Sequence, residues 1–401
     1  MKVLMINSVC GVRSTGRICT DLAQMLEAKG HTVKIAYGRM AVAENYQTYA
    51  HKIGGDLDVK LHGLKARLWD ASGFGSKKAT RRFIKWVEEF DPDIIHLHNI
   101  HGYYLNVELL FKYLRRCGKP ILWSFYDCWS FTGHCAHFDY NGCQKWQTGC
   151  YDCQFKGDYP KSFVDRSEEN HERKRRLFTG IPNLQLIVPS KWMASMVYQS
   201  YMKEYPCHVL PNGIDIGQFS PLPGDVKETY GIEDKNLVLG VSSVWQKMKG
   251  LDHINKLAQL LPQEKYRILL VGGGEDKEPI HPSILRVHHT DSIQELCRIY
   301  TAADVFINPT LQETQGLTTV EAFACGTPAV VFNAGGAAEC VDDTCGIIVP
   351  KDDTNALQAA IEKVCREKPF KAEACRKKAE AYDKNVCYQA FMALYDELCS
   401  Q

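Results

Sequence analysis

Short apolar runs alternate with amphipathic stretches through both halves of the chain. In the first half, apolar residues fill most of positions 2–7 and 32–37, and the segment between them repeats apolar residues at helical spacing. In the second half, apolar runs at 236–242, 266–271 and 304–307 follow a similar rhythm. Buried strands that alternate with amphipathic helices are typical of doubly wound α/β domains. The pattern therefore predicts α/β domains in both halves.

Turn-forming residues interrupt this pattern near the middle of the chain. Residues 209–221 contain two prolines and an Asn-Gly pair, which favour turns over regular structure. A chain of 401 residues is long enough for two cores of ordinary size. We predict an N-terminal domain over residues 1–208 and a C-terminal domain over residues 209–383.

The strongest candidate for chemistry lies between residues 308 and 336. A buried strand is followed by a turn that contains Gly316, and a helix is predicted from about Leu317 to Cys325. The N-terminus of such a helix binds anions through free amide groups. Glu313 and Glu321 flank this position, although carboxylates repel an anion. A nucleotide-sugar satisfies both features, because amides bind its phosphates and carboxylates accept hydrogen bonds from its sugar hydroxyls.

These residues resemble a known signature. Glu313 and Glu321, together with the Gly-x-Pro and Gly-Gly segments that follow, resemble the Glu-x7-Glu motif of retaining glycosyltransferases of family 4. Residues 209–221 resemble the family's Asn-Gly-x-Asp-x-x-x-Phe-x-Pro segment. The resemblance implies the GT-B fold, in which two doubly wound Rossmann-like domains face a cleft. In this fold a C-terminal helix, here within residues 384–401, commonly returns to the N-terminal domain.

The resemblance also implies roles in donor binding. Glu313 would contact the donor sugar, Glu321 would hold the ribose, and the turn amides would hold the diphosphate. Lys249 matches a basic position that binds the diphosphate, whereas Val244 stands where the family has an arginine. The residues implied for donor binding are Gly16, Lys249, Glu313, Gly316, Leu317, Thr318 and Glu321.

Polar and aromatic residues gather where two strands of the first half are predicted to end. Ligands of open α/β sheets bind beyond the carboxyl ends of the strands, so these residues are candidates for the acceptor side. Asp127 is the nearest ionisable group, and we expect it to steer or deprotonate the acceptor hydroxyl, which makes it the third candidate catalytic residue beside Lys249 and Glu313. Tyr126 stands where the family usually has a histidine. The acceptor-side candidates are His98, Asn99, His101, Tyr103 and Tyr126.

A cysteine-rich insertion is predicted over residues 128–155. Cys135, Cys143, Cys150 and Cys153 can supply four thiolates, which is the ligand set of a structural zinc site. Reduced, packed thiols are a second interpretation, and a redox or iron–sulfur role is a third. A subset of family 4, bacterial enzymes that build surface polysaccharides, carries a similar cysteine-rich stretch.

The whole chain has a net charge of +1 and no apolar run long enough to cross a bilayer, which argues against nucleic acid as a partner and favours a cytoplasmic location. Residues 64–89 are rich in Lys and Arg and include Trp69 and Phe74. One hypothesis is a patch that binds the acceptor or the inner-membrane surface. The alternative is a solvated helix face beside an ordered loop.

Together these features predict a glycosyltransferase, and the resemblance implies that it is of the retaining, hexosyltransferase type. It would move a sugar from a UDP- or GDP-sugar to a glycan acceptor, expected to be a lipid-linked oligosaccharide for capsule, O-antigen or exopolysaccharide. Basic side chains and helix dipoles would replace a catalytic metal at the phosphates. The alternatives are a nucleotide-sugar epimerase of the same fold and a zinc-bearing binding protein.

Overall fold

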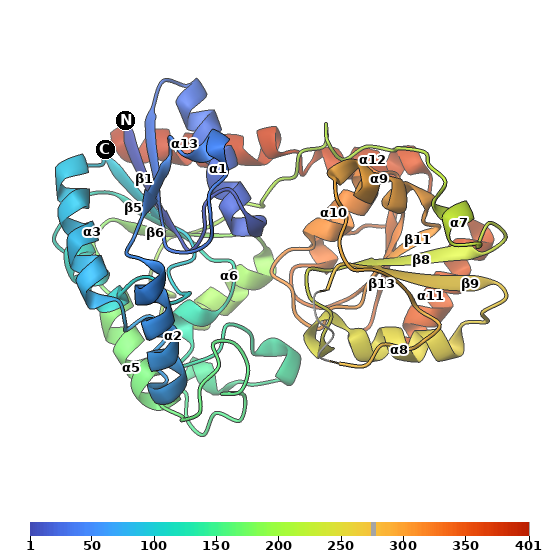
Figure 1. Cartoon of the computed structure of the whole chain (residues 1–401), viewed down its shortest axis with the longest axis horizontal. Coiled ribbons are helices and arrows are strands. Elements are labelled where there is room, and N and C mark those ends of the chain that lie inside the picture. Colours follow the sequence, from blue (N-terminus) through green and yellow to red (C-terminus); the bar gives the residue numbers. More distant parts are fainter. Residues whose placement is uncertain (274–277, 401) are drawn as a thin grey trace. The chain divides into compact units, whose positions relative to one another are not determined.

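The computed structural model describes residues 1–273 and 278–400. The chain forms two compact units, which we call the N-terminal unit (residues 1–210 and 388–401) and the C-terminal unit (residues 211–387) (Figure 1). The sheets of both units consist of parallel strands, which run through buried apolar residues.

The N-terminal unit contains a sheet with the strand order β3-β2-β1-β4-β5-β6-β7. The chain reverses its direction of winding between β1 and β4, which lie side by side. The strands are β1 (Lys2–Asn7), β2 (Thr32–Tyr37), β3 (Ala50–Lys52), β4 (Ile94–Leu97), β5 (Ile121–Ser124), β6 (Leu184–Val188) and β7 (Cys207–Val209). Ligands of doubly wound sheets bind at such a reversal, beyond the carboxyl ends of the strands.

The helices of the N-terminal unit pack against this sheet or border it. They are α1 (Arg13–Ala28), α2 (Asp56–Trp69), α3 (Lys77–Phe90), α4 (Val107–Leu114), α5 (Ser167–Phe178) and α6 (Lys191–Tyr198). The chain's last helix, α13 (Lys384–Ser400), joins the unit from Tyr388 onward, and a hydrogen bond of 2.5 Å links the hydroxyl of Tyr395 to Nδ1 of His96. This bond fastens α13 to β4.

Gly16, which the resemblance implies for donor binding, lies in the first turn of α1, because the helix begins at Arg13. Phe74 is not a surface residue: it is 1% exposed and lies under the guanidinium of Arg173, 3.8 Å from it. The ring of Phe74 therefore packs in the apolar core of the N-terminal unit.

Within residues 211–273 and 278–387, the C-terminal unit contains a sheet with the strand order β10-β9-β8-β11-β12-β13. Its reversal lies between β8 and β11, which are paired. The strands are β8 (Asn236–Val241), β9 (Tyr266–Val271), β10 (Leu285–Val287), β11 (Val305–Asn308), β12 (Ala329–Phe332) and β13 (Gly346–Val349). Figure 1 shows α9 (Ile293–Ala302), α10 (Leu317–Ala324) and α12 (Ala372–Glu380) on one face of this sheet. It shows α8 (Leu251–Leu260) and α11 (Thr354–Glu367) on the other.

The segment between β5 and α5 contains short 3-10 helices and no strand, all of its residues being described. These helices are η2 (Trp129–Phe131), η3 (Asp139–Asn141) and η4 (Lys145–Gln147). We call residues 128–166 the cysteine-rich segment. Across the described parts of the chain, every helix is too short or too polar to pass through a lipid bilayer.

Candidate active site

Two loops of the C-terminal unit bring Lys249 and Glu313 together at the reversal of the sheet. The loop after β8 lies on the loop after β11, because the amide of Leu311 donates to the carbonyl of Met248 at 2.9 Å. Gly250 makes this contact possible: its φ is +77°, and a Cβ atom there would lie 2.1 Å from the carbonyl oxygen of Pro309. The ammonium of Lys249 and the carboxylate of Glu313 form an ion pair, and their side chains are 23% and 25% exposed. A ligand can therefore reach both charges.

The backbone of Glu313 is fixed by the Gly-Gly pair that follows β12. The amide of Gly336 donates to the carbonyl of Glu313 at 2.7 Å. Gly335 has a φ of +60°, and a Cβ atom there would lie 2.2 Å from the same carbonyl oxygen. A side chain at position 335 would thus displace Glu313, which explains why the Gly-Gly pair accompanies Glu313 in the motif.

Helix α10 begins directly after Glu313, with Gly316 as its N-cap. Of the three amides implied for the diphosphate, that of Gly316 is hydrogen-bonded to the thiol of Cys340, and that of Leu317 donates to the carbonyl of Gln315 at 3.1 Å. Among the described residues, the amide of Thr318 has no acceptor. This amide, at the positive end of the helix, is the one best placed for an anion.

Glu321 lies just over one turn into α10, and Tyr300 holds its carboxylate. The hydroxyl of Tyr300 donates to Oε2 of Glu321 at 2.9 Å, and Tyr300 is fully buried on α9. Burial raises the pKa of Tyr300 well above its ordinary value, so the hydroxyl remains a donor. The sequence pattern marks Tyr300 only as a core position of a helix, and sequence reasoning missed its polar role.

A second residue missed from the sequence is Gln315, which is buried at the start of α10. Its Oε1 accepts a hydrogen bond from the amide of Asn212, and its Nε2 donates to the carbonyl of Asn212, both at 2.9 Å. The two bonds attach the Asn-Gly segment at the start of the unit to the loop that carries Glu313.

Val244, which replaces the family's arginine, is 49% exposed, and the exposed Lys247 lies in the same loop.

In the N-terminal unit, the ends of β1, β4 and β5 gather several of the predicted acceptor-side residues. Nδ1 of His98 lies 2.8 Å from the hydroxyl of Tyr126, and the amide of Asn99 donates to Oδ1 of Asn7 at 3.2 Å. Burial lowers the pKa of His98 to about 3, so its ring is neutral. Asn7, at the end of β1, was missed because its position in an apolar strand suggested only burial.

His101 and Asp127 form a second polar cluster at the same edge. Nε2 of His101 lies 2.6 Å from Oδ2 of Asp127, and Nδ1 lies 3.0 Å from the hydroxyl of Tyr159. The other oxygen of Asp127 accepts from the amide of Trp129 at 2.9 Å. Burial raises the pKa of Asp127, but the attraction of His101 and His137 and the hydrogen bonds from His101 and the Trp129 amide together outweigh burial, so the pKa lies below its ordinary value. Asp127 is thus an ionised group with both oxygens occupied.

The two remaining candidates of the N-terminal unit are Tyr103, which lies beside Tyr159, and Gly16, which packs within α1. Tyr103 has a φ of +72°, and its ring meets the edge of the Tyr159 ring at 6.4 Å between centroids. Gly16 is buried in α1, and its carbonyl accepts a hydrogen bond from the amide of Gly11 at 3.1 Å. Tyr159 comes from the cysteine-rich segment and is 44% exposed, so it is the part of the His101–Asp127–Tyr159 chain that an acceptor can reach.

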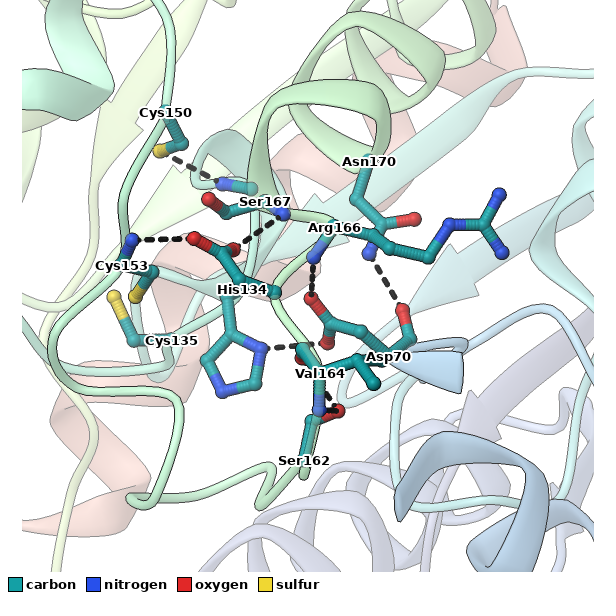
Figure 2. A network of polar contacts seen from close by, with 12 residues as sticks. Asp70, His134, Cys135, Cys150, Cys153, Ser162, Val164, Arg166, Ser167 and Asn170 are labelled. Carbon is teal, nitrogen blue, oxygen red and sulfur yellow. Dashed lines mark hydrogen bonds and ion pairs between the residues drawn. The ribbon is translucent and has the colours of Figure 1, made fainter. Parts of the chain in front are cut away.

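The four predicted thiol ligands line a single cavity of about 280 Å³ in the cysteine-rich segment. Figure 2 shows the sulfur atoms of Cys135 and Cys153 turned toward one another, while the sulfur of Cys150 accepts from the amide of Gly133 at 3.1 Å. Burial raises the pKa of Cys150 to about 12 and that of Cys153 to about 11, which favours neutral thiols where no cation is near. Within residues 1–273 and 278–400, no three His, Cys, Asp or Glu side chains are already arranged to hold a metal ion.

Asp70, the residue that ends α2, anchors this segment. Its carboxylate accepts from Nδ1 of His134 at 2.6 Å and from the amide of Arg166 at 3.1 Å (Figure 2). Its carbonyl accepts from the side-chain amide of Asn170 at 2.5 Å. Asp70 adopts a φ of +48°, which turns the chain after α2. Its carboxylate and its carbonyl both lie against the cysteine-rich segment and the start of α5.

Comparison with known families decides the identity of the scaffold. A model described as Glycosyltransferase Family 4 matches residues 15–218, which is just over half of the chain, and a model described as Glycosyl transferases group 1 matches residues 235–367. The chain belongs to glycosyltransferase family 4.

Relatives within family 4 are distant. The putative colanic acid biosynthesis glycosyl transferase WcaC of Escherichia coli K12 is 28% identical over 246 residues, which are 58% of this chain and 59% of WcaC. A mannosyltransferase of Mycolicibacterium hassiacum is 28% identical over 201 residues, which are 47% of each chain. The chain thus spans about half of the length of these relatives.

Solved structures confirm the predicted fold class for this family 4 chain. A sucrose-phosphate synthase from Thermosynechococcus elongatus superposes with a TM-score of 0.72 at 17% identity, covering 100% of this chain and 99% of the other. Anabaena HepE in complex with UDP-glucose superposes with a TM-score of 0.68 at 15% identity, covering 99% and 100%. The GT-B architecture of two Rossmann-like domains is therefore shown.

Proposed function

We propose that this protein transfers a sugar from a UDP- or GDP-sugar to a glycan acceptor and retains the anomeric configuration. The observation that carries the proposal is the group of Lys249, Glu313, the N-terminus of α10 and Glu321 at one sheet reversal. One cation and one helix end suit a diphosphate, and the two carboxylates suit the hydroxyls on either side of it.

The Lys249–Glu313 pair suggests how the donor enters. The pair is partly exposed, so solvent screens part of its attraction and a charged ligand can compete for either partner. The donor diphosphate would take over Lys249, and Glu313 would then accept hydrogen bonds from the sugar. As the bond to the sugar breaks, negative charge grows on the leaving diphosphate, which Lys249 and the helix end stabilise. HepE was solved with UDP-glucose, which favours a UDP-sugar among the two donor types.

On the acceptor side, the hydrogen bonds suggest a more specific role for Asp127 than direct contact with the acceptor. Asp127 would fix the orientation of His101, so that Nδ1 of His101 accepts a hydrogen bond from the Tyr159 hydroxyl. The oxygen of Tyr159 would in turn accept a hydrogen bond from the acceptor hydroxyl. WcaC is named for colanic acid biosynthesis, which supports a growing lipid-linked oligosaccharide of a bacterial surface polysaccharide as the acceptor.

For the cysteine-rich segment we propose structural zinc. Four thiols line one cavity of a segment that has no strand and little regular helix among its described residues, and zinc would cross-link its loops. Cys135, Cys143, Cys150 and Cys153 would hold the ion as thiolates, after the side chains turn into the cavity. The ion would hold the fold of the segment and would take no part in the transfer.

The test is sugar transfer by purified protein, with UDP- and GDP-sugars as donors and lipid-linked oligosaccharides as acceptors. Glu313→Ala should lower transfer at least about 100-fold, because it removes a group that acts on the reacting sugar. Glu373→Ala, which removes an exposed carboxylate of α12, is the matched control and should leave transfer unchanged. Unchanged turnover in Glu313→Ala would contradict the site, and conversion of the donor without any acceptor would favour an epimerase instead.

A further inference from the structure

Helix α2 exposes a stripe of leucines to solvent. Leu57, Leu61, Leu64 and Leu68 recur every three or four residues, which places them on one face of the helix. These side chains are 68%, 58%, 53% and 38% exposed. The helix buries only His62 and Ala66, on its opposite side. A surface helix normally turns its leucines inward, so this arrangement leaves an apolar face without a partner within the described chain.

Further exposed apolar side chains lie close to the end of α2. Trp69 is 52% exposed, and Phe163 and Val164 of the cysteine-rich segment are 61% and 39% exposed. The amide of Phe163 and the hydroxyl of Ser162 donate to the carbonyl of Arg67 at 2.8 and 3.2 Å, which holds these residues against the helix. Figure 2 shows Ser162 and Val164 beside Asp70, where α2 ends. We call α2's four leucines with Trp69, Phe163 and Val164 the apolar face.

Cations border the apolar face on both sides. Helical spacing places Lys60 and Arg67 along one edge of the leucine stripe and Lys65 along the other. Lys161 is exposed beside Phe163, whereas Arg166, which follows the exposed Asp165, pairs with Glu169. Of the two acidic residues of α2, Asp56 pairs with Lys52 at 2.8 Å, and Asp58 accepts from the amide of Gly55 at 2.9 Å. The cations Lys60, Lys65, Arg67 and Lys161 outnumber the carboxylates of Asp58 and Asp165, so the rim carries a net positive charge.

We propose that the apolar face docks on a membrane that contains anionic lipid. The helix α2 would lie in the plane of the interface with its leucines among the acyl chains. Trp69 and Phe163 would sit at the headgroup level, and the cationic rim would meet the phosphates. The combination of apolar centre and cationic rim favours this partner over an acidic protein, which the leucines would not recognise. The choice of a lipid-linked acceptor rests on the proposed function, whereas the docking does not.

This surface differs from the patch expected from residues 64–89. Phe74 belongs to the core, and Trp69 is the last residue of α2 rather than part of a loop. Four of the seven side chains of the apolar face, Leu57, Leu61, Phe163 and Val164, lie outside that range. The basic residues of α3 lie on a separate helix, so the leucines of α2 rather than the charges of α3 define the surface.

The experiment is flotation of the full-length protein with vesicles of phosphatidylcholine alone or mixed with phosphatidylglycerol. We expect the protein to float with the anionic vesicles and to float less as salt is raised. The triple variant Leu57→Gln, Leu61→Gln, Leu64→Gln should lower the partition coefficient at least about tenfold, because it removes the inserted face. The control Leu260→Gln, Ile348→Gln, Val386→Gln removes three exposed apolar side chains of the other unit and should float like the wild type.

Two further measurements separate docking from folding and from catalysis. All seven side chains of the apolar face are exposed, so the melting temperature of the leucine variant and its stabilisation by UDP should equal those of the wild type. The proposal is overturned if the wild type stays unbound with anionic vesicles, or if the leucine variant floats as well as the wild type. It is also overturned if the wild type is a dimer that the leucine variant converts to a monomer without any binding to vesicles, because a second copy would then cover the face.

Discussion

At the residue scale, the site depends on a few side chains and glycines whose contacts are specific. Gly250 and Gly335 each lie where a Cβ atom would strike a carbonyl oxygen, and these contacts set the positions of Lys249 and Glu313. The two carboxylates could be predicted from the sequence because their eight-residue spacing belongs to one continuous segment. Tyr300, Gln315 and Tyr159 could not, because each finds its partner through tertiary packing rather than through a local pattern.

Tyr300 offers a prediction at this scale. Tyr300→Phe removes the hydrogen bond that orients Glu321, and a hydrogen bond of this kind contributes about 1 kcal/mol. We expect the Kd for UDP to rise about fivefold, measured by isothermal titration calorimetry. Tyr230→Phe is the matched control, since no described residue forms a hydrogen bond with its hydroxyl, and its affinity should not change. Equal affinities of wild type and Tyr300→Phe would show that Glu321 does not hold the ribose.

At the element scale, strands and amphipathic helices followed from the periodicity, whereas the beginning of α1 and the role of α2 did not. Helix α1 begins at Arg13, whose φ of +57° is not predictable from residue type. The leucines of α2 recur at helical spacing, but the sequence does not tell which face of a helix the fold buries. The cysteine-rich segment was recognised from spacing alone, but its anchor, Asp70, lies more than fifty residues before it.

The cysteine-rich segment carries the prediction at this scale. Protein purified without a His tag should contain about one zinc ion per chain, measured by inductively coupled plasma mass spectrometry. Cys143→Ser, Cys153→Ser should lose the metal and melt at a lower temperature, because the segment would lose its cross-link. Cys399→Ser, which changes the exposed cysteine near the C-terminus, should keep it. Wild-type protein without metal would leave packed thiols as the better interpretation.

At the scale of the whole molecule, the two units share the same kind of topology, a parallel sheet that reverses its direction of winding between two neighbouring strands. In each, most of the predicted site residues follow strands that meet at the reversal of the sheet, β1 and β4 in one unit and β8 and β11 in the other, while Tyr126 and Asp127 follow the neighbouring β5. The sequence predicted two such units because both halves repeat the same alternation of strand and helix. It could not predict the hydrogen bond that fastens α13 to β4, since Tyr395 and His96 lie 299 residues apart.

The most direct test of the account is a crystal of the protein soaked with UDP. We expect the pyrophosphate at the N-terminus of α10, within hydrogen-bonding distance of the Thr318 amide and of Lys249, and the ribose hydroxyls on Glu321. UDP bound at another place, or no bound UDP at concentrations that saturate binding in solution, would contradict the central claim that this helix end and its two carboxylates form the donor site.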